Sequence, residues 1–451
     1  MSVCHRKTGH GRNSIDSNCQ WNRLLRGFYL MNSHPLPLSK ANLLVMMKHH
    51  LLRPSRKGSV VGVADDLCGL HATSSITPYL SLFNRIDGFS PEDLNRELNL
   101  KRLQRVRAMR GTLFLVSREM FPVVAIATRA SEDKILRALL RWHISNHEFQ
   151  TVSKAILSTL NQHSKTIVEI KRDVPRKFSR TIARKMGWRV MKRTNVDEVL
   201  NLLILQGKIQ SQAEPLVWDD VKWDGYGLRF FSAIRKITYS PTPTGTDDIL
   251  DNSARTKLVE SYIRRYGPVA IDDIAWWIDL PRKIVANIVN SISDELSKVR
   301  IKGLRPEFLL HKDELSSLQE LNQEHSSVHF LPYEDPYAKG FKLRQRLIAH
   351  SFERIAYPTG GALPTVLVDG RIIGTWSITT ADHVLRLLVR RFDPLERTTL
   401  EKVREEGQRL GRFLTREVPT EVTIEGEKQW RQIIATSRPT YYLTGTPRRK
   451  E

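Results

Sequence analysis

The sequence contains few cysteines and no long apolar run. Only Cys4, Cys19 and Cys68 occur in 451 residues, too few for a disulfide framework and typical of a protein that works in a reducing compartment. No stretch approaches the roughly 20 apolar residues that span a bilayer, and no lipidation motif occurs. The patterns GxxxxGK[ST], HExxH and CxxC are also missing, as is a GxGxxG after a strand, which argues against nucleotide-using enzymes and standard zinc sites. We therefore expect no membrane partner, no metal and no cofactor.

Acidic residues are scarce relative to basic ones. The chain has 71 Lys and Arg against 48 Asp and Glu, so its formal charge is 71 − 48 = +23. Such an excess favours a polyanionic partner. Because no sequence feature indicates a membrane, we expect a nucleic acid.

The length of 451 residues indicates roughly two to four domains. Residues 1–36 are basic, lack periodicity and have no apolar signal-peptide core, so we expect a disordered extension rather than a secretory signal. The folded pattern begins near Leu38. Residues 441–451 form a basic tail.

Residues 37–150 show the element order of a winged helix-turn-helix. A helix is predicted over 39–52 with Ser39 as its N-cap, and a second helical region over 65–85 that is interrupted near Thr77-Pro78. A third begins at Ser90, which is followed by Pro at the first helical position and Asp at the third. The stretch RVRAMRGTLFLV then becomes strand-like, as expected of a basic wing.

The same order recurs twice before the pattern changes. We predict a second winged helix with a basic insertion over 151–250 and a third over 251–327, where VRIKGLRPEFLL supplies a two-stranded wing. Strand patterns dominate 328–440, with a hairpin at Asp369-Gly370. The predicted fold class is α+β, with three tandem winged helix-turn-helix modules followed by a C-terminal β-barrel-like domain.

Two basic runs are candidate DNA contacts. Residues 171–193 contain ten Lys or Arg and one acid, interleaved with Phe178 and Trp188, and residues 101–110 contain five basic residues. Cations of this kind follow a phosphate backbone, and aromatics stack on bases; a solvated charged face is the simpler alternative. The candidates are Lys101, Arg102, Arg105, Arg107, Arg110, Arg176, Lys177, Arg180, Arg184, Lys185, Arg189, Lys192 and Arg193, with Arg371 of the VDGR turn as a further phosphate contact.

Three segments in order carry a family resemblance. They are GLHATSSITPYLSLFNRIDGFSPEDL with MRGTLFLV, then YGPVAIDDIAWWIDL, and then LPYEDPYAKGFK with PTVLVDGRIIGTW. Together they resemble the bacterial winged-helix DNA-binding family that includes the DNA glycosylases AlkZ and YcaQ. The resemblance runs from about residue 38 to 440. It implies tandem winged helices that hold a C-terminal β-barrel, duplex DNA in a basic channel, and hydrolysis of the N-glycosidic bond of alkylated purines, with unhooking of interstrand crosslinks.

The resemblance also implies where the chemistry would occur. The family's Gln-apolar-Gln or Gln-apolar-Asp triplet falls on His71, Ala72 and Thr73, so both polar positions differ here. A neutral His71, with a reference pKa of about 6.5, suits a general base for a water molecule, and Thr73 supplies a second hydrogen bond. These two residues are our catalytic candidates. In the competing structural reading, His71 is a satisfied, half-buried histidine and Thr73, Ser74 or Ser75 caps the following helix.

Two functions follow. The first is a monofunctional DNA glycosylase, a cytoplasmic, nucleoid-associated monomer that acts on damaged or crosslinked duplex DNA without a cofactor. The second is a non-catalytic winged-helix DNA-binding protein, either a regulator or a DNA-protecting factor, which the loss of the Gln pair favours.

Overall fold

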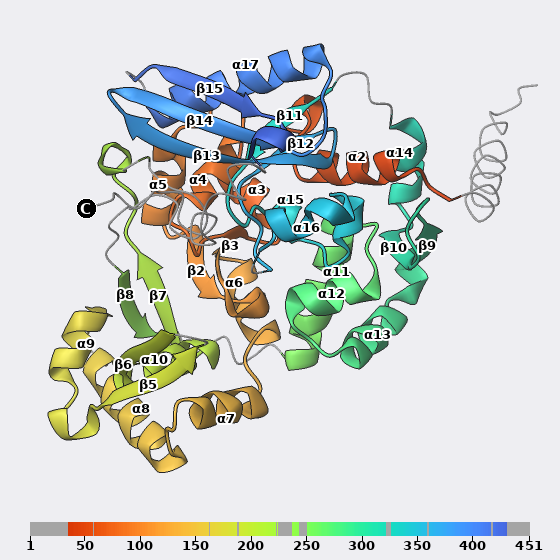
Figure 1. The fold of residues 1–451 in the computed structure, drawn as a ribbon. Coiled ribbons are helices and arrows are strands. Elements are labelled where there is room, and N and C mark those ends of the chain that lie inside the picture. Colours follow the sequence, from red (N-terminus) through yellow and green to blue (C-terminus); the bar gives the residue numbers. More distant parts are fainter. Residues whose placement is uncertain are drawn as a thin grey trace, which may run out of the picture.

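A computed structural model describes residues 35–430 except 57, 162, 187–188, 222, 224–236, 243–249, 322–325, 359 and 416–417. The predicted extension and the basic tail lie outside the described residues, apart from residues 35 and 36, and so does Trp188. The described part is a mixed α+β structure (Figure 1). Among its helices, none has the length and apolar character needed to cross a membrane.

The first unit combines helices with a small three-stranded sheet. Its strands lie in the order β1-β3-β2 and are antiparallel. Ser90 and Asp93 form the predicted capping box at the start of α5. The elements are α2 (Leu38–Lys48), η1 (Arg53–Ser55), α3 (Val60–Asp66), β1 (Leu70–His71), α4 (Thr77–Phe83), α5 (Pro91–Asn99), β2 (Leu103–Arg107), η2 (Met109–Gly111), β3 (Leu113–Ser117) and α6 (Met120–Ala127).

Two local predictions for this unit are wrong. Helix α2 begins at Leu38, and its N-terminus has no side-chain cap, so Ser39 is not the N-cap. The expected helical region over 65–85 is split, because residues 70–71 pair with β3. Strand pairing between distant segments outweighs local helical preference there.

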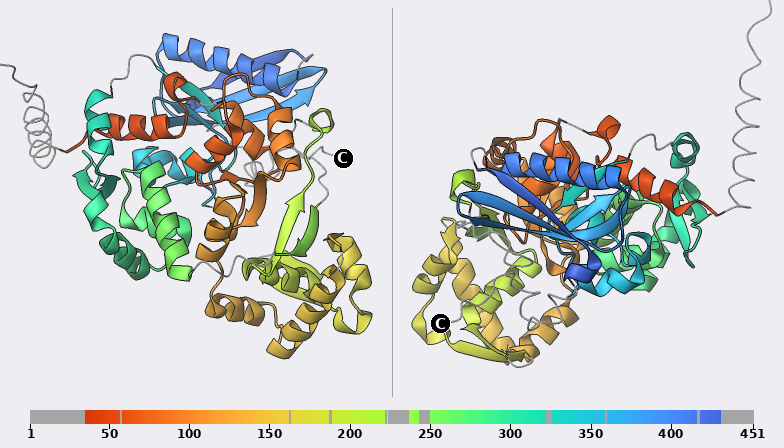
Figure 2. Two further views of the ribbon diagram at one scale, coloured as in Figure 1. Left: turned by 180° about the vertical axis from the view of Figure 1, so that it is seen from behind. Right: turned by 45° about the horizontal axis from the view of Figure 1, so that its top comes forward.

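The second unit has its own core. Residues from Ile135 to Ile209 bury a cluster of their own, and the unit lies at the opposite end of the molecule from α17 in both views of Figure 2. Its basic run forms an antiparallel hairpin of β5 and β6. The elements are α7 (Glu132–Arg141), α8 (Asn146–Leu160), β4 (Lys165–Thr166), α9 (Ile167–Asp173), η3 (Arg176–Phe178), β5 (Thr181–Met186), β6 (Arg189–Thr194), α10 (Asn195–Leu205), β7 (Ile209–Ala213), η4 (Trp218–Asp220) and β8 (Ile237–Pro241).

The third helical unit shares its core with its neighbours. Buried side chains of α11 and α12 belong to one cluster with residues of α2 and α6 and of the chain beyond Leu331. Trp277 is buried in this cluster, and Asp273 accepts a hydrogen bond from Ala270 at the start of α12. The elements are α11 (Asp251–Tyr266), α12 (Ile271–Ile278), α13 (Arg282–Ser291), η6 (Ser293–Glu295), β9 (Leu296–Arg300), β10 (Glu307–His311) and α14 (Glu314–Glu320). Strands β9 and β10 form an antiparallel pair where two strands were predicted.

The C-terminal region forms an open five-stranded sheet in the order β11-β12-β13-β14-β15. Within the described residues the sheet does not close: β11 and β15 are its edges, and α17 packs against both. The predicted β-barrel-like domain is therefore corrected to an open sheet covered by a helix. The elements are β11 (Val328–Leu331), α15 (Pro336–Lys339), η7 (Arg344–Arg346), α16 (His350–Ala356), β12 (Thr365–Val368), β13 (Arg371–Ala381), β14 (Val384–Arg391), α17 (Arg397–Leu414) and β15 (Thr420–Glu425).

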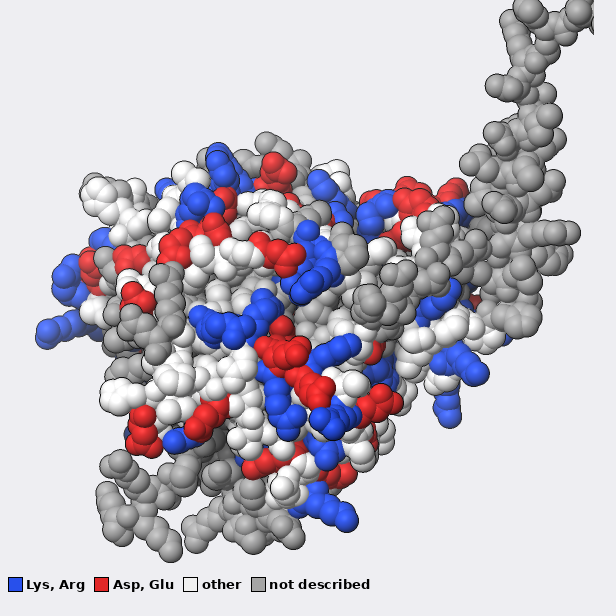
Figure 3. Space-filling view, turned by 90° about the horizontal axis from the view of Figure 1, so that it is seen from above, with Lys and Arg blue, Asp and Glu red and all other residues white. Residues whose placement is uncertain are grey.

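The Asp369-Gly370 hairpin between β12 and β13 is present as predicted, with both residues at positive φ. The face that carries α17 shows basic and acidic side chains interspersed (Figure 3). A phosphate-binding surface requires positively charged side chains grouped together without acidic side chains among them. This face is therefore not where the excess positive charge gathers.

Candidate functional site

The His71–Thr73 segment is an extended strand end rather than the start of a helix. His71 pairs with Phe114 of β3, and the amide of Ala72 donates to the carbonyl of Leu113 at 2.7 Å. Gly69 precedes the strand with φ +111°, and a Cβ there would lie 2.9 Å from a methyl group of Val116. Only glycine fits this combination of backbone and space.

The structure excludes the helix-cap reading of the triplet. Helix α4 begins at Thr77, its N-cap is Ile76, and no side chain caps it. His71 is also not half-buried and satisfied. Only 2% of it is exposed, and its Nδ1 has no hydrogen-bond partner among the described residues.

His71 and Thr73 meet as the family resemblance requires. The Thr73 hydroxyl lies 3.5 Å from His71 Nε2, and Thr73 is exposed while His71 is buried. Burial and, to a smaller extent, the nearby ammonium of Lys339 lower the pKa of His71 from 6.5 to about 3. The imidazole is therefore neutral at physiological pH and offers a lone pair as well as an N–H.

The same cluster contains a carboxylate that our sequence analysis did not identify. Glu334 Oε2 lies 3.6 Å from His71 Nε2, and only 3% of Glu334 is exposed. Its other oxygen accepts from the amide of Ala362, and its carboxylate forms an ion pair with Lys339. Gly361 makes room for it, because a Cβ at that position would lie 2.6 Å from Oε1. The available signal was the acidic pair that directly follows the apolar strand in LPYEDPYAKG.

Helix α4 and the residues directly after it hold Glu334 opposite the triplet. The Thr77 hydroxyl donates to the Tyr333 carbonyl at 2.8 Å. Two residues along the loop, Asp335 forms a two-pronged ion pair with Arg85 at 2.9 and 2.7 Å. Neither of these charged side chains is exposed. The helix that follows His71 thus fixes the loop that carries Glu334.

Cations and an aromatic ring border the cluster. The Arg110 guanidinium lies 4.0 Å from the ring centroid of Trp276, and the Arg344 guanidinium lies 5.6 Å from it. Burial lowers the pKa of Arg110, of Arg344 and of Lys339, and the Glu334 carboxylate opposes this shift in each. The three cations therefore surround one carboxylate.

The acids next to the triplet in sequence have other partners. Asp66 pairs with His50 at 2.8 Å and with Arg265 at 2.5 Å. Burial raises the pKa of Asp65, and a hydrogen bond from Ser117 opposes that shift. No described contact joins either acid to His71.

The two basic runs converge on one hollow. Arg107 of the first run and Arg193 of the second line a cavity of about 380 Å³ together with Asp197, Asn201 and Tyr239. Burial lowers the pKa of Arg107, and the Nε of Arg107 is buried without a hydrogen-bond partner in the described structure. The sequence did not indicate this convergence, because the runs belong to different units.

The predicted DNA contacts differ in how far their side chains are exposed to solvent. The exposed cations are Lys101, Arg102, Arg110, Arg176, Lys177, Arg180, Lys185 and Lys192, whereas Arg105, Arg107, Arg184, Arg193 and Arg371 are partly buried. Of Arg189 only the backbone, in β6, is described.

Several of these side chains have protein partners, among them Arg107, which donates to the carbonyl of Gly111 at 2.9 Å, and Arg193, which pairs with Glu198 at 2.9 Å. Arg102 lies 3.3 Å from Glu97, Arg105 donates to Ser211 at 3.0 Å, and Arg180 pairs with Glu148 at 2.8 Å. Arg371 donates to the carbonyls of residues 345 and 346 at 2.9 and 3.0 Å. These contacts position the guanidinium groups and occupy part of their donor capacity.

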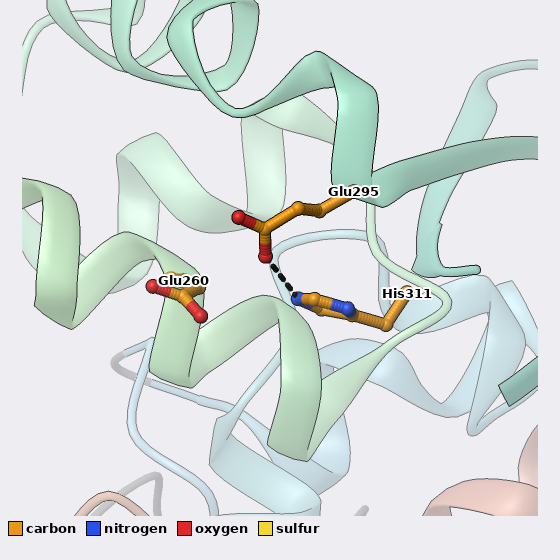
Figure 4. Close-up of side chains that lie close together, drawn as sticks. All are labelled: Glu260, Glu295 and His311. Carbon is orange, nitrogen blue, oxygen red and sulfur yellow. Dashed lines mark ion pairs between the residues drawn. The ribbon is translucent and has the colours of Figure 1, made fainter. Parts of the chain in front are cut away.

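One group of side chains has the composition of a metal site. Glu260, Glu295 and His311 place ligand atoms within 4.8 Å of one another (Figure 4). The Arg264 guanidinium lies 3.1 and 3.2 Å from the two ring nitrogens of His311. A cation against the imidazole competes with a metal ion for the same lone pair, so we assign no metal to this group.

The fold agrees with the comparisons with known proteins. The chain belongs to the AlkZ-like DNA glycosylase family, whose model matches residues 64–413.

An individual relative is the interstrand DNA cross-link repair glycosylase of Streptomyces sahachiroi. It is 23% identical over 380 residues, which cover 81% of this chain and 94% of the relative. The solved structure of Streptomyces sahachiroi DNA glycosylase AlkZ superposes with a TM-score of 0.65 at 18% identity, covering 86% of this chain and all of that one. This structural likeness establishes the fold.

Proposed function

We propose that the protein is a monofunctional DNA N-glycosylase that removes alkylated, positively charged purines and unhooks interstrand crosslinks built on them. The observation that carries the proposal is the contact of His71 Nε2 with both the Thr73 hydroxyl and the Glu334 carboxylate, at 3.5 and 3.6 Å. The substrate class comes from family membership and from the name of the Streptomyces relative.

These distances leave hydrogen-bonding capacity for a water molecule. Separations near 3.5 Å are long for direct hydrogen bonds, so the three groups can also bind a water that lies beside them. A neutral His71 accepts or donates one hydrogen bond, and Thr73 reaches the water from the exposed side. The cluster therefore holds a nucleophile at the buried end of a site that opens to solvent at Thr73.

The reaction needs little acid catalysis. A purine alkylated at N7 or N3 is cationic, so the electrons of its glycosidic bond leave with a neutral base. The water oxygen bonds to C1′, and its proton passes to the Glu334 carboxylate and then to solvent, which leaves an abasic sugar. The same carboxylate stabilises the positive charge that develops on the sugar before the water bonds.

We propose that the two basic runs bind the duplex that carries the lesion. The cavity shared by Arg107 and Arg193 and the exposed cations of the β5–β6 hairpin support this assignment. Cations of this kind contribute most of the affinity for DNA backbones without reading sequence.

The finer architecture belongs to the same proposal. Helix groups that end in β2–β3, in β7–β8 and in β9–β10 support three winged-helix modules. We propose that the C-terminal sheet fills the role of the family's barrel domain, since α17 spans its two edges. We also propose that the protein is a monomer, because one chain supplies every residue of the site. We propose that it acts at the nucleoid in the cytoplasm, where the DNA substrate lies.

The test is release of base from duplexes that contain N7-methylguanine or an interstrand crosslink. We expect wild-type protein to form abasic product and Glu334→Gln to slow release about 100- to 1,000-fold, with duplex affinity unchanged. His71→Ala also slows release. Glu401→Gln, which changes an exposed carboxylate of α17, is the matched control and keeps the wild-type rate.

Two results would contradict the proposal. One is a wild-type rate for Glu334→Gln. The other is steeply salt-dependent binding of duplex by wild-type protein with no abasic product from any lesion, which would establish the alternative of a non-catalytic DNA-binding protein.

A further inference from the structure

The ring of Trp276 is a partly buried aromatic surface beside the candidate site. Helix α12 places Trp277 in the core and leaves Trp276 only partly buried. The guanidinium of Arg110 lies over its ring, and Arg344 approaches the same ring from the loop that follows Glu334.

The two arginines are held very differently. Arg344 donates to the carbonyl of Gly360 at 2.9 Å and lies 3.6 Å from the ring centroid of Tyr357. Arg110 is exposed, and among the described residues its guanidinium has no hydrogen bond or ion pair besides its stacking on Trp276. Arg110 is therefore the cation that can leave the ring at small cost, whereas Arg344 is fixed.

Arg110 also occupies an unusual backbone position. It sits at φ +56°, next to Gly111, in the turn between β2 and β3. Residues other than glycine seldom adopt this conformation. The turn presents the guanidinium to Trp276 across the boundary between the first and third units.

We propose that Trp276 is the stacking platform for the extruded, positively charged purine, and that Arg110 occupies this platform in the free protein. This inference rests on the proposed function. A guanidinium and an alkylated purine share two properties, since both are planar and both carry delocalised positive charge. A ring that binds one through its π face binds the other for the same reason.

The platform would also select the substrate. A neutral base gains stacking on the indole but no cation–π attraction, and it must still displace a cation. A cationic base replaces one planar cation with another. The displaced Arg110 remains beside the DNA, where the phosphate of the extruded nucleotide offers it an anion.

Free nucleosides test the platform without requiring catalysis. Binding of 7-methylguanosine and of guanosine is measured by NMR titration at mildly acidic pH, where the methylated nucleoside is cationic. Wild-type protein should prefer the cationic nucleoside. Trp276→Leu should weaken its binding about 10- to 100-fold, as expected for loss of base stacking and of a cation–π contact, with a smaller effect on guanosine, which loses stacking alone.

Arg110→Ala should change the affinity for 7-methylguanosine in the opposite direction to Trp276→Leu. Removing the competing guanidinium should tighten binding of 7-methylguanosine while it weakens binding of undamaged duplex. Trp277→Phe, which changes the buried neighbour on the same helix, is the matched control and should leave both unchanged.

The outcomes separate the two proposals. The platform is overturned if wild-type protein has no preference for the cationic nucleoside, if Trp276→Leu binds it normally, or if Arg110→Ala weakens its binding. Base release by wild-type protein together with any of these results leaves the glycosylase intact and refutes the platform. Trp276-dependent nucleoside binding without base release supports the platform and refutes the glycosylase.

Discussion

The buried, neutral state of His71 makes a quantitative prediction about stability. The substitution is His71→Gln, which removes the titrating imidazole and keeps a polar side chain in the triplet. In the folded protein burial lowers the pKa of His71 from 6.5 to about 3, with a smaller contribution from Lys339. Between these two values the unfolded chain binds a proton that the folded protein does not. The contribution of the neutral His71 to the free energy of unfolding is therefore fully present above pH 6.5 and is lost as the pH falls toward 3.

The size of the effect follows from this pKa difference. At pH 5 the unfolded chain gains about 2 kcal/mol from protonation of this one imidazole, and at pH 4 about 3 kcal/mol. At pH 7 the corresponding gain is close to zero. His49 and His329 are also buried, and burial lowers the pKa of each well below 6.5, so wild-type protein should lose more than this in total. The contribution of His71 has to be isolated by difference.

The assay is denaturant unfolding at pH 7 and pH 5 of wild-type protein and of His71→Gln. His49, His329 and the carboxylates titrate alike in both proteins and cancel. We expect the wild type to lose about 2 kcal/mol more than the variant between the two pH values. An equal loss in the two proteins would refute the assignment, because it would mean that His71 is protonated in the folded state or exposed to solvent.

Three further predictions concern the supports of the site. Asp335→Asn leaves the buried guanidinium of Arg85 without its charge partner and should lower the free energy of unfolding by about 3–5 kcal/mol in denaturant titrations; a loss below about 1 kcal/mol would count against a buried pair. Gly361→Ala places a methyl group 2.6 Å from Oε1 of Glu334 and should slow base release about 100-fold by displacing the carboxylate, with duplex affinity unchanged; a wild-type rate would contradict this. Lys185→Ala should reduce the salt dependence of duplex binding by about one charge, and an unchanged slope would exclude this part of the β5–β6 hairpin from the interface.

Local sequence signals predicted local structure well. The capping box at Ser90 and the turn at Asp369-Gly370 depend on residues within a few positions of one another, and both are present. The two-residue strand at His71 was missed because its stability comes from pairing with β3. Closure of the sheet was also mispredicted, since strand patterns do not say whether a helix such as α17 covers the edges.

The site itself was half predictable. The triplet was located from the order of motifs, but Glu334 faces His71 only because Thr77 of α4 and Arg85, just beyond that helix, hold the Tyr333–Asp335 loop. None of these contacts has a local sequence signature. Nor does the sequence reveal that Arg110 reaches Trp276, since the two lie in different units.

The position of Glu334 bears on the loss of the Gln pair. In the family's Gln-apolar-Asp form a carboxylate stands within the triplet itself, whereas here that position is Thr73 and the nearest carboxylate comes from the loop after β11. A carboxylate on a different element stabilises the same charge if it lies at the same distance. Judged by the triplet alone, the chain lacks the carboxylate of the Gln-apolar-Asp form; judged by the space around His71, it has a carboxylate, buried and held by Lys339 and Ala362. The decisive comparison is therefore between Glu334→Gln and Thr73→Ala. If Glu334 has taken over the role of the triplet carboxylate, base release should be far slower in the first variant than in the second, and the reverse order would return that role to the triplet.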